Sequence, residues 1–264
     1  MSDSVLAVIP ARLASERLPE KPLQPIAGRP LIEWVWRRVR SMALFGEVVV
    51  ATDHPKVESL CRAFGAAVRM TDPAHPSGTD RVAEVADLTE FRHHPFVVNI
   101  QGDEPLVEEA APAAAVQLLR DGWELATCAS PLGSLDAFHD PSVVKVARGT
   151  DGRALYFSRA PIPHLRGRTP DPHQLADIPF LRHHGLYACR REALLQWVSL
   201  PPSPLEEIER LEQLRALEAG IPFGVAVVAD GAGGVDTAED LARMEELLTG
   251  NSRPDRTATM GTHD

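Results

Sequence analysis

The chain has 264 residues, of which 44% are hydrophobic, and its formal net charge is −10 at pH 7. This length suits one large α/β domain, or a domain with a small lobe, and the acidic balance argues against a general nucleic-acid binder. Because the sequence shows neither a run of about 18 apolar residues nor a signal-like N-terminus, we expect no membrane contact and a cytoplasmic location.

A basic loop follows the first predicted strand. Residues 5–9 are a continuous apolar run, typical of a buried parallel strand, and the loop after them carries Arg12, Arg17 and Lys21 between prolines. Ligands of open α/β sheets bind at the carboxyl ends of strands, so these cations are expected to face one crevice. The loop lacks the Walker and dinucleotide patterns, so side chains would bind a polyphosphate. A solvated basic loop is the alternative that charge alone leaves open.

Strands and helices then alternate as far as residue 100. Gly28-Arg29-Pro30 opens a helix whose apolar positions reach Met42, and a second helix runs from Val57 to a stop at Gly65. A third helix begins in Gly78-Thr79-Asp80-Arg81. Strands are predicted at 48–50, near Val68 and at 96–100. This alternation predicts a doubly wound, mostly parallel sheet.

The pattern changes after about residue 124. Strands are predicted at 125–129, 143–147, 154–158 and 185–189, and they suggest a smaller mixed-sheet lobe. The proline-rich stretch 161–180 is expected to be exposed. We therefore expect residues 1–248 to form a single α/β domain with the lobe inserted at about 124–190, and residues 249–264 to form a disordered tail.

Two acidic residues are candidates for a metal site. Asp103 follows the strand that ends at Ile100, and Gly102 beside it would let the backbone approach a ligand closely. Magnesium usually takes one or two protein carboxylates, so Asp103 needs at most one partner, and Asp236 is the candidate. The alternative for Asp236 is a helix N-cap, because Glu239 follows three residues later.

A carboxylate is also predicted on the apolar face of a helix. Ser203 opens this helix with a capping box, and a count of about 100° per residue places Glu212 between Leu205 and Ile208. An uncompensated buried carboxylate is unfavourable. Glu212 therefore either reaches solvent at the edge of the face or has a ligand.

Histidines occur in adjacent pairs. His183 and Tyr187 would share one face of a strand. The pairs at 93–94 and 183–184 lack metal-ligand spacing, because adjacent strand residues point to opposite faces, and no zinc is assigned.

Several segments together resemble one family, the bacterial 3-deoxy-D-manno-octulosonate (KDO) cytidylyltransferases, or CMP-KDO synthetases. Each segment alone is weak evidence, but their joint order and spacing are specific, and they cover the chain to about residue 248. In order, they are IPARLASERLPEKPL from residue 9, ATDHPKV at 51–57, HPSGTDRVAEV at 75–85, NIQGDEP at 99–105, VVKVARGTDGRALYFSRAPIP at 143–163, LRHHGLY at 181–187, SPLEEIERLEQLRALEAG at 203–220 and GVDTAEDL at 234–241.

The resemblance implies a Rossmann-like sheet with a dimerisation lobe, and a homodimer. It also implies a nucleotidyltransferase that uses Mg²⁺ to transfer the cytidylyl group of CTP to the anomeric hydroxyl of KDO. Pyrophosphate would be released, and the activated sugar would serve lipopolysaccharide biosynthesis. The stretch 164–180 and the tail from 249 carry none of the family's motif residues.

The resemblance also implies the site residues. Those that would bind CTP are Arg12, Ser15, Lys21, Ser77, Gly78, Thr79 and Arg81. Those that would line the sugar pocket are Gln101, Arg159, His183, Tyr187, Glu212 and Gln213. The catalytic set would be Arg12, Lys21, Asp103 and Asp236, with both aspartates as metal ligands. An arginine fork suits the sugar carboxylate, and a sugar ligand would account for Glu212.

Two rival functions remain open at this point. A cytidylyltransferase for 8-amino-KDO would use nearly the same pocket, whereas sialate enzymes begin with a glycine-richer loop than residues 11–21 provide. A nucleotide-binding regulator without catalysis is the alternative of another class, although it would not need both metal carboxylates. The sequence does not separate KDO from 8-amino-KDO.

Overall fold

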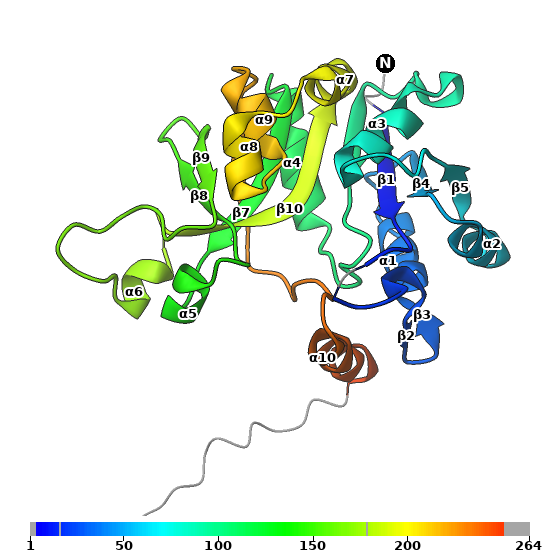
Figure 1. Ribbon diagram of the computed structural model, residues 1–264, viewed down its shortest axis with the longest axis horizontal. Coiled ribbons are helices and arrows are strands. Elements are labelled where there is room, and N and C mark those ends of the chain that lie inside the picture. The colour runs from blue at the N-terminus through cyan, green and yellow to red at the C-terminus, as the bar shows by residue number, and fades with distance from the viewer. Residues whose placement is uncertain (1–3, 16, 178, 251–264) are drawn as a thin grey trace, which may run out of the picture.

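The computed structural model describes residues 4–15, 17–177 and 179–250. Within these residues the main sheet has nine strands, seven of them in the order β11-β7-β10-β6-β1-β4-β5 (Figure 1). These seven are β1 (Val5–Ala11), β4 (Glu47–Thr52), β5 (Ala67–Met70), β6 (Phe96–Asn99), β7 (Leu125–Pro131), β10 (Leu181–Arg190) and β11 (Phe223–Val227). Only β10 runs antiparallel to both of its neighbours on this path, so the mostly parallel sheet is confirmed.

Helices cover both faces of the sheet, as doubly wound folds require. Along β1, Val5, Ala7 and Ile9 belong to one hydrophobic cluster while Leu6 and Val8 belong to another, which explains the continuous apolar run. Helices with residues in the first cluster are α1 (Leu31–Arg40), α2 (Pro55–Ala63), α4 (Ala110–Arg120) and α10 (Ala238–Thr249). Those with residues in the second are α3 (Gly78–Asp87), α7 (Arg191–Ser199), α8 (Pro204–Glu209) and α9 (Gln213–Glu218).

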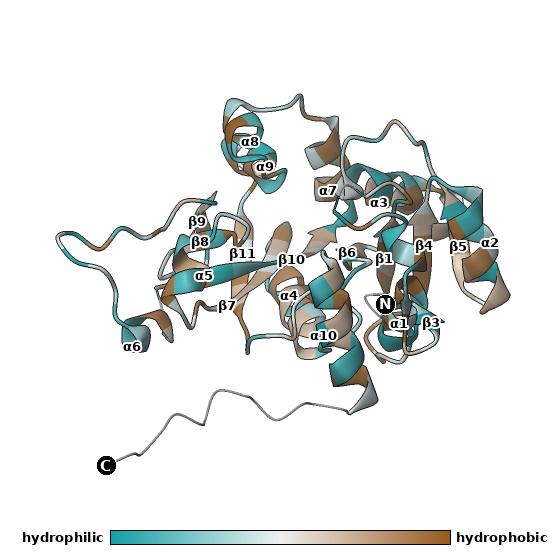
Figure 2. Ribbon diagram, turned by 60° about the horizontal axis from the view of Figure 1, so that its bottom comes forward, coloured by the Kyte–Doolittle hydropathy of each residue, from teal (hydrophilic) through white to brown (hydrophobic). Residues whose placement is uncertain are grey.

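Most of these helices are apolar on one side only. Polar and apolar residues alternate around α2, α8 and α10 in the hydropathy colouring (Figure 2). Among the described residues, none of the helices has both the length and the hydropathy needed to cross a membrane. Short elements complete this part of the chain: η1 (Lys21–Leu23), η2 (Thr89–Phe91), and the hairpin of β2 (Pro25–Ile26) and β3 (Arg29–Pro30).

A smaller group of elements, including the other two strands of the sheet, projects to one side of the seven-strand path (Figure 1). It comprises α5 (Leu135–His139), β8 (Lys145–Arg148), β9 (Ala154–Ser158) and α6 (Pro172–Leu175). β7 and β10, which the sequence suggested for the lobe, run through the central sheet instead, and β8 pairs with the first two residues of β10. The domain boundary and the lobe limits stay predictions.

The proline-rich stretch 161–180 is not uniformly exposed. Its helix α6 has a complete capping box, and Leu175 and Phe180 pack with Leu132 and Phe138 in a third hydrophobic cluster. The expectation of an exposed segment is therefore confirmed for most of its described residues, but Leu175 and Phe180 are buried and anchor the second half. Of the expected tail, residue 249 ends α10 and residues 251–264 lie outside the described residues.

Candidate active site

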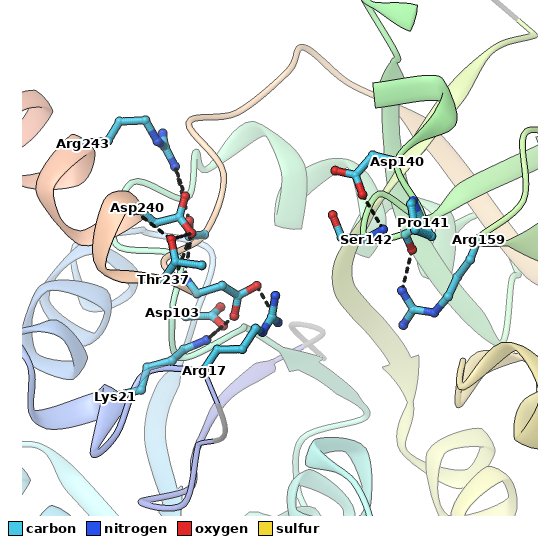
Figure 3. A network of polar contacts seen from close by, with 12 residues as sticks. Arg17, Lys21, Asp103, Asp140, Pro141, Ser142, Arg159, Thr237, Asp240 and Arg243 are labelled. Atoms are coloured by element: carbon cyan, nitrogen blue, oxygen red, sulfur yellow. Dashed lines mark hydrogen bonds and ion pairs between the residues drawn. The ribbon is translucent and has the colours of Figure 1, made fainter. Parts of the chain in front are cut away.

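Lys21 lies between the two acidic residues that the sequence proposed as metal ligands. Its ammonium donates to the Asp103 carboxylate and, at 2.8 Å, to Asp236 Oδ1 (Figure 3). Arg17 adds a second cation 3.0 Å from Asp236 Oδ2. Burial by itself lowers the pKa of Lys21, but the two carboxylates outweigh it and raise the pKa above its ordinary value. The cluster therefore keeps a positive charge fixed between two negative ones.

A cleft of about 370 Å³ surrounds this cluster. Arg12, Arg17 and Lys21 all line it, which confirms that the cations of the basic loop face one crevice. Predicted site residues that also line it are Ser15, Gly78, Gln101, Asp103 and Asp236. It lies at the carboxyl ends of β1 and β6, the edge where α/β sheets bind ligands.

Gly102 brings the loops after β1 and β6 together. A Cβ atom on Gly102 would lie 2.6 Å from the Pro10 carbonyl oxygen, closer than real Cβ contacts allow. The sequence predicted a close approach to a ligand at this glycine; the close approach observed is to the neighbouring backbone. Gly102 thus positions Asp103 beside the basic loop.

Asp236 does not cap helix α10. The N-cap of α10 is Thr237, which accepts from the Asp240 N–H at 3.1 Å, and Asp240 completes the capping box. The capping alternative for Asp236 is therefore wrong, because the helix begins one residue later. The Val235 N–H also donates to the Asp103 carbonyl at 2.9 Å, so the two acidic segments are joined.

The donor set fits a hard divalent cation. Two carboxylates converge on one point, where the Lys21 ammonium now supplies the positive charge. Magnesium and its relatives take oxygen ligands and need one or two protein carboxylates, the remaining positions being filled by water and substrate phosphate. Asp103 and Asp236 can supply those ligands in an open cleft.

A second hollow lies beside α8 and α9 and holds three of the six residues predicted to line the sugar pocket, together with one residue predicted to bind CTP. Ser77, Tyr187, Glu212 and Gln213 line it. The Tyr187 hydroxyl donates to Gln213 Oε1 at 3.0 Å, and both side chains are buried. Burial raises the pKa of Tyr187 well above its ordinary value, so its hydroxyl stays protonated.

Glu212 is the least satisfied polar group of this hollow. Its Oε1 accepts from the Thr79 hydroxyl at 2.7 Å, whereas its buried Oε2 has no hydrogen-bond partner within the part of the chain that the structure describes. Burial raises the pKa of Glu212. Oε2 is therefore withdrawn from solvent, although Glu212 as a whole is half-buried. The helical count failed because Arg210 adopts a left-handed conformation (φ 52°) that separates α8 from α9.

Two predicted ligands have structural partners in this conformation. Arg81 is fully buried and donates to Thr71 and, at 3.0 Å, to Asp53 Oδ2, so it lies beneath the cleft. Gln101 donates from Nε2 to the Gly185 carbonyl at 2.7 Å. Their roles as direct ligands stay predictions.

His183 and Arg159 lie apart from the carboxylate cluster. His183 Nε2 is 2.8 Å from the Thr127 hydroxyl, and burial lowers the pKa of His183 to about 3, so the ring is neutral. The Arg159 guanidinium donates to the carbonyls of Glu209 at 2.8 Å and Pro141 at 2.9 Å, well away from Lys21 (Figure 3).

Sequence reasoning assigned no role to two groups at the site. Glu104 follows Asp103 directly, and burial together with the Asp103 charge raises the pKa of Glu104 to about 7. Asp53 holds Arg81 and lies 3.4 Å from the Leu13 N–H, so it supports the basic loop. Asp53 lies in the segment ATDHPKV and Glu104 in NIQGDEP, two of the segments that resemble the family. Their position in these segments is the sequence signal that could have identified them.

Comparison with known proteins gives a consistent family. The model of the cytidylyltransferase family matches residues 6–223. A 3-deoxy-manno-octulosonate cytidylyltransferase of Gemmatimonas aurantiaca is 52% identical over 241 residues, 90% of this chain and 92% of that protein. The one from Syntrophotalea carbinolica is 44% identical over 94% of this chain and 99% of that protein.

Solved structures agree. A CMP:2-keto-3-deoxy-manno-octonic acid synthetase complexed with CTP superposes with a TM-score of 0.85 and 40% identity, over 94% of this chain and 99% of that one. The 4-diphosphocytidyl-2C-methyl-D-erythritol synthase of Anaerococcus prevotii, at 13% identity and a TM-score of 0.61, shares the fold over 93% of this chain and 98% of that one. The chain belongs to the cytidylyltransferase family and, within it, to the 3-deoxy-manno-octulosonate cytidylyltransferases.

Proposed function

We propose that this protein transfers the cytidylyl group of CTP to the anomeric hydroxyl of KDO and releases pyrophosphate. The observation that carries the proposal is the convergence of Lys21, Asp103 and Asp236 in a cleft also lined by Arg12 and Arg17. The names of the relatives, and the CTP complex of the similar structure, support the choice of both substrates.

The chain's own residues position the reactants. Arg12, Arg17 and Lys21 would bind the triphosphate oxygens, since guanidinium and ammonium groups match phosphate. The anomeric oxygen attacks the α-phosphorus; its new bond to phosphorus forms as the bond to pyrophosphate breaks, and the hydroxyl proton is released. Such transfers depend on positioning and charge stabilisation rather than on a covalent nucleophile.

Asp103 and Asp236 would hold Mg²⁺ in this reaction. The bound ion would neutralise charge on the phosphate oxygens and lower the pKa of a coordinated hydroxyl. The Lys21 ammonium, whose present partners are these two carboxylates, would then be available to bind the triphosphate.

The hollow beside α9 would take the sugar. Glu212 and Gln213 would accept hydrogen bonds from sugar hydroxyls, and the unpartnered Oε2 of Glu212 offers an acceptor position. Arg159 would bind the sugar carboxylate in exchange for the carbonyl groups of Glu209, Pro141 and Arg210, to which its guanidinium now donates. Neutral His183 would stay beneath Tyr187, where their ring centroids are 5.6 Å apart.

We also propose that the protein is a cytoplasmic homodimer whose product serves lipopolysaccharide biosynthesis. Support for a dimer comes from two large apolar side chains on the projecting side of the molecule: Leu155 on β9 is 60% exposed and Ile208 on α8 is 79% exposed. Light scattering of the full chain tests the dimer, and Leu155→Lys with Ile208→Lys should yield monomers.

The activity is tested by pyrophosphate release from CTP and Mg²⁺ with freshly prepared KDO, with 8-amino-KDO and sialic acid in parallel. Release with KDO well above the others supports the proposal. Preference for 8-amino-KDO would keep the mechanism and change the substrate. Silence with all three sugars, despite tight CTP binding, would favour the non-catalytic regulator.

A further inference from the structure

Three side chains of the metal-binding kind meet at the sheet edge opposite the cleft. Glu47 is the first residue of β4, and His93 and His94 lie in the turn that precedes β6. Glu47 Oε1 is 3.4 Å from His94 Nε2 and 3.7 Å from His93 Nε2. One ligand atom from each residue can be chosen so that all three lie within 4.8 Å of one another.

The geometry corrects the sequence argument against metal binding at these histidines. The sequence prediction placed His93 and His94 on a strand, where neighbouring side chains point to opposite faces. In the turn their rings lie together instead, with centroids 4.0 Å apart. In the sheet β1 lies between β4 and β6, so the cluster joins the starts of two strands that flank β1.

An unpartnered nitrogen points into the cluster. His94 is only 1% exposed, yet its Nε2 has no hydrogen-bond partner among the described residues. Its Nδ1 lies 2.8 Å from Ser4 Oγ, and when Nδ1 donates there, Nε2 turns its lone pair toward the Glu47 carboxylate. In that tautomer a buried acceptor faces an anion, an unfavourable contact that a cation between them would relieve.

We propose that Glu47, His93 and His94 form a zinc site. Two imidazoles and one carboxylate are a common zinc ligand set, whereas magnesium prefers an all-oxygen set. Ligands at about 2.0–2.1 Å in a tetrahedron lie about 3.4 Å apart, and the Glu47–His94 pair already has this spacing. The side chains of His93 and Glu47 are 59% and 45% exposed, so water can reach the fourth position.

The surroundings of His94 support a built site. A ligating histidine usually donates its other ring nitrogen to a fixed acceptor, and Ser4 Oγ is placed for that role. A Cβ on Gly46 would come within 2.8 Å of that hydroxyl and 3.5 Å of His94 Cε1, so the glycine makes room for the contact. Zinc here would tie the starts of β4 and β6 together and would take no part in cytidylyl transfer.

The test is zinc binding by the full-length, untagged protein after removal of metals with a chelator. Calorimetric titration in millimolar Mg²⁺ keeps the acidic residues of the cleft occupied. We expect one zinc ion per chain and a higher melting temperature. His93→Ala and Glu47→Gln, both at exposed ligands, should each weaken binding about tenfold or more and leave pyrophosphate release unchanged. His173→Ala, at an exposed histidine on α6, is the control and should bind as the native chain does.

Cobalt(II) supplies an independent measurement, because tetrahedral coordination by the cluster gives visible absorption that both ligand variants should lose. The proposal is overturned if the native chain binds no zinc at submillimolar concentrations. It is equally overturned if His93→Ala and Glu47→Gln bind zinc as tightly as the control, because the metal would then lie elsewhere. Neither result depends on which sugar the enzyme uses.

Discussion

Lys21 and Asp236 are 215 positions apart in the chain, yet the ammonium of one lies 2.8 Å from Oδ1 of the other. The contact holds the start of α10 against the basic loop after β1. Asp103 shares the same ammonium, so Lys21 links three loops of the carboxyl edge. If a bound ligand moves the Lys21 ammonium, another cation must therefore take its place between the Asp103 and Asp236 carboxylates.

Asp103→Asn should lower kcat about a hundredfold, a barrier increase of roughly 3 kcal/mol, by analogy with the loss of one preorganised electrostatic group. The amide keeps the shape of the side chain and removes the charge that Mg²⁺ needs. Pyrophosphate release at saturating CTP and KDO measures the effect. Asp230→Asn, which removes a carboxylate paired with Arg182 outside the cleft, should stay active. Near-normal turnover of Asp103→Asn would remove Asp103 from the metal role.

Gly102→Ala should unfold more easily, by about 1–3 kcal/mol, since its methyl group would collide with the Pro10 carbonyl at 2.6 Å. Urea unfolding measures the change. Gly231→Ala is the matched control, because a Cβ there meets nothing within 4 Å. If both variants are equally stable, close packing of the two loops does not require glycine at position 102.

Thr237→Ala should lose about 1 kcal/mol of stability, the usual effect of deleting an N-cap side chain. Because Thr237 fixes the residue that follows Asp236, this variant should also need more Mg²⁺ for half-maximal activity. Ser134→Ala removes a comparable cap from α5, a helix that contributes no residue to the cleft, and should leave the Mg²⁺ dependence unchanged. Equal Mg²⁺ dependence in the two variants would show that the cap does not position Asp236.

Glu212→Gln separates function from stability. The buried carboxylate has one unpartnered oxygen, so replacing it by a neutral amide should change the unfolding free energy by no more than about 1 kcal/mol. The same change removes a charged acceptor for a sugar hydroxyl and should raise the KM for KDO about tenfold with the KM for CTP unchanged. A large loss of stability with normal KDO kinetics would make Glu212 a structural residue.

Local patterns predicted most elements of the fold because each strand and helix of the first hundred residues has its own periodicity. Asp103 could be placed at the carboxyl edge for the same reason. The pairing of strands that are distant in the chain could not be predicted in this way. β10 joins the central sheet through its antiparallel partners β6 and β7, and its apolar pattern does not indicate which strands it pairs with. The break at Arg210 was also missed, since a left-handed non-glycine residue has no reliable sequence signal. That break decides where Glu212 points.

His184 should make the fold sensitive to acid. Burial is the main cause that lowers the pKa of His184 to about 4, whereas an unfolded chain binds this proton near pH 6.5. The unfolded state therefore holds more protons between these two values. The stabilising contribution is complete above about pH 6.5 and falls as the pH decreases toward 4.

Between pH 7.5 and 5.5 this one histidine should account for about 1.4 kcal/mol of lost unfolding free energy. His184→Gln keeps a polar group near Ser130 Oγ, which now lies 2.9 Å from Nε2, and should lose correspondingly less stability over that interval. Urea unfolding at the two pH values gives the difference, with His173→Gln on α6 as the exposed control. If native protein and His184→Gln lose the same amount, the ring is already protonated in the folded state, and its burial does not destabilise the charged form.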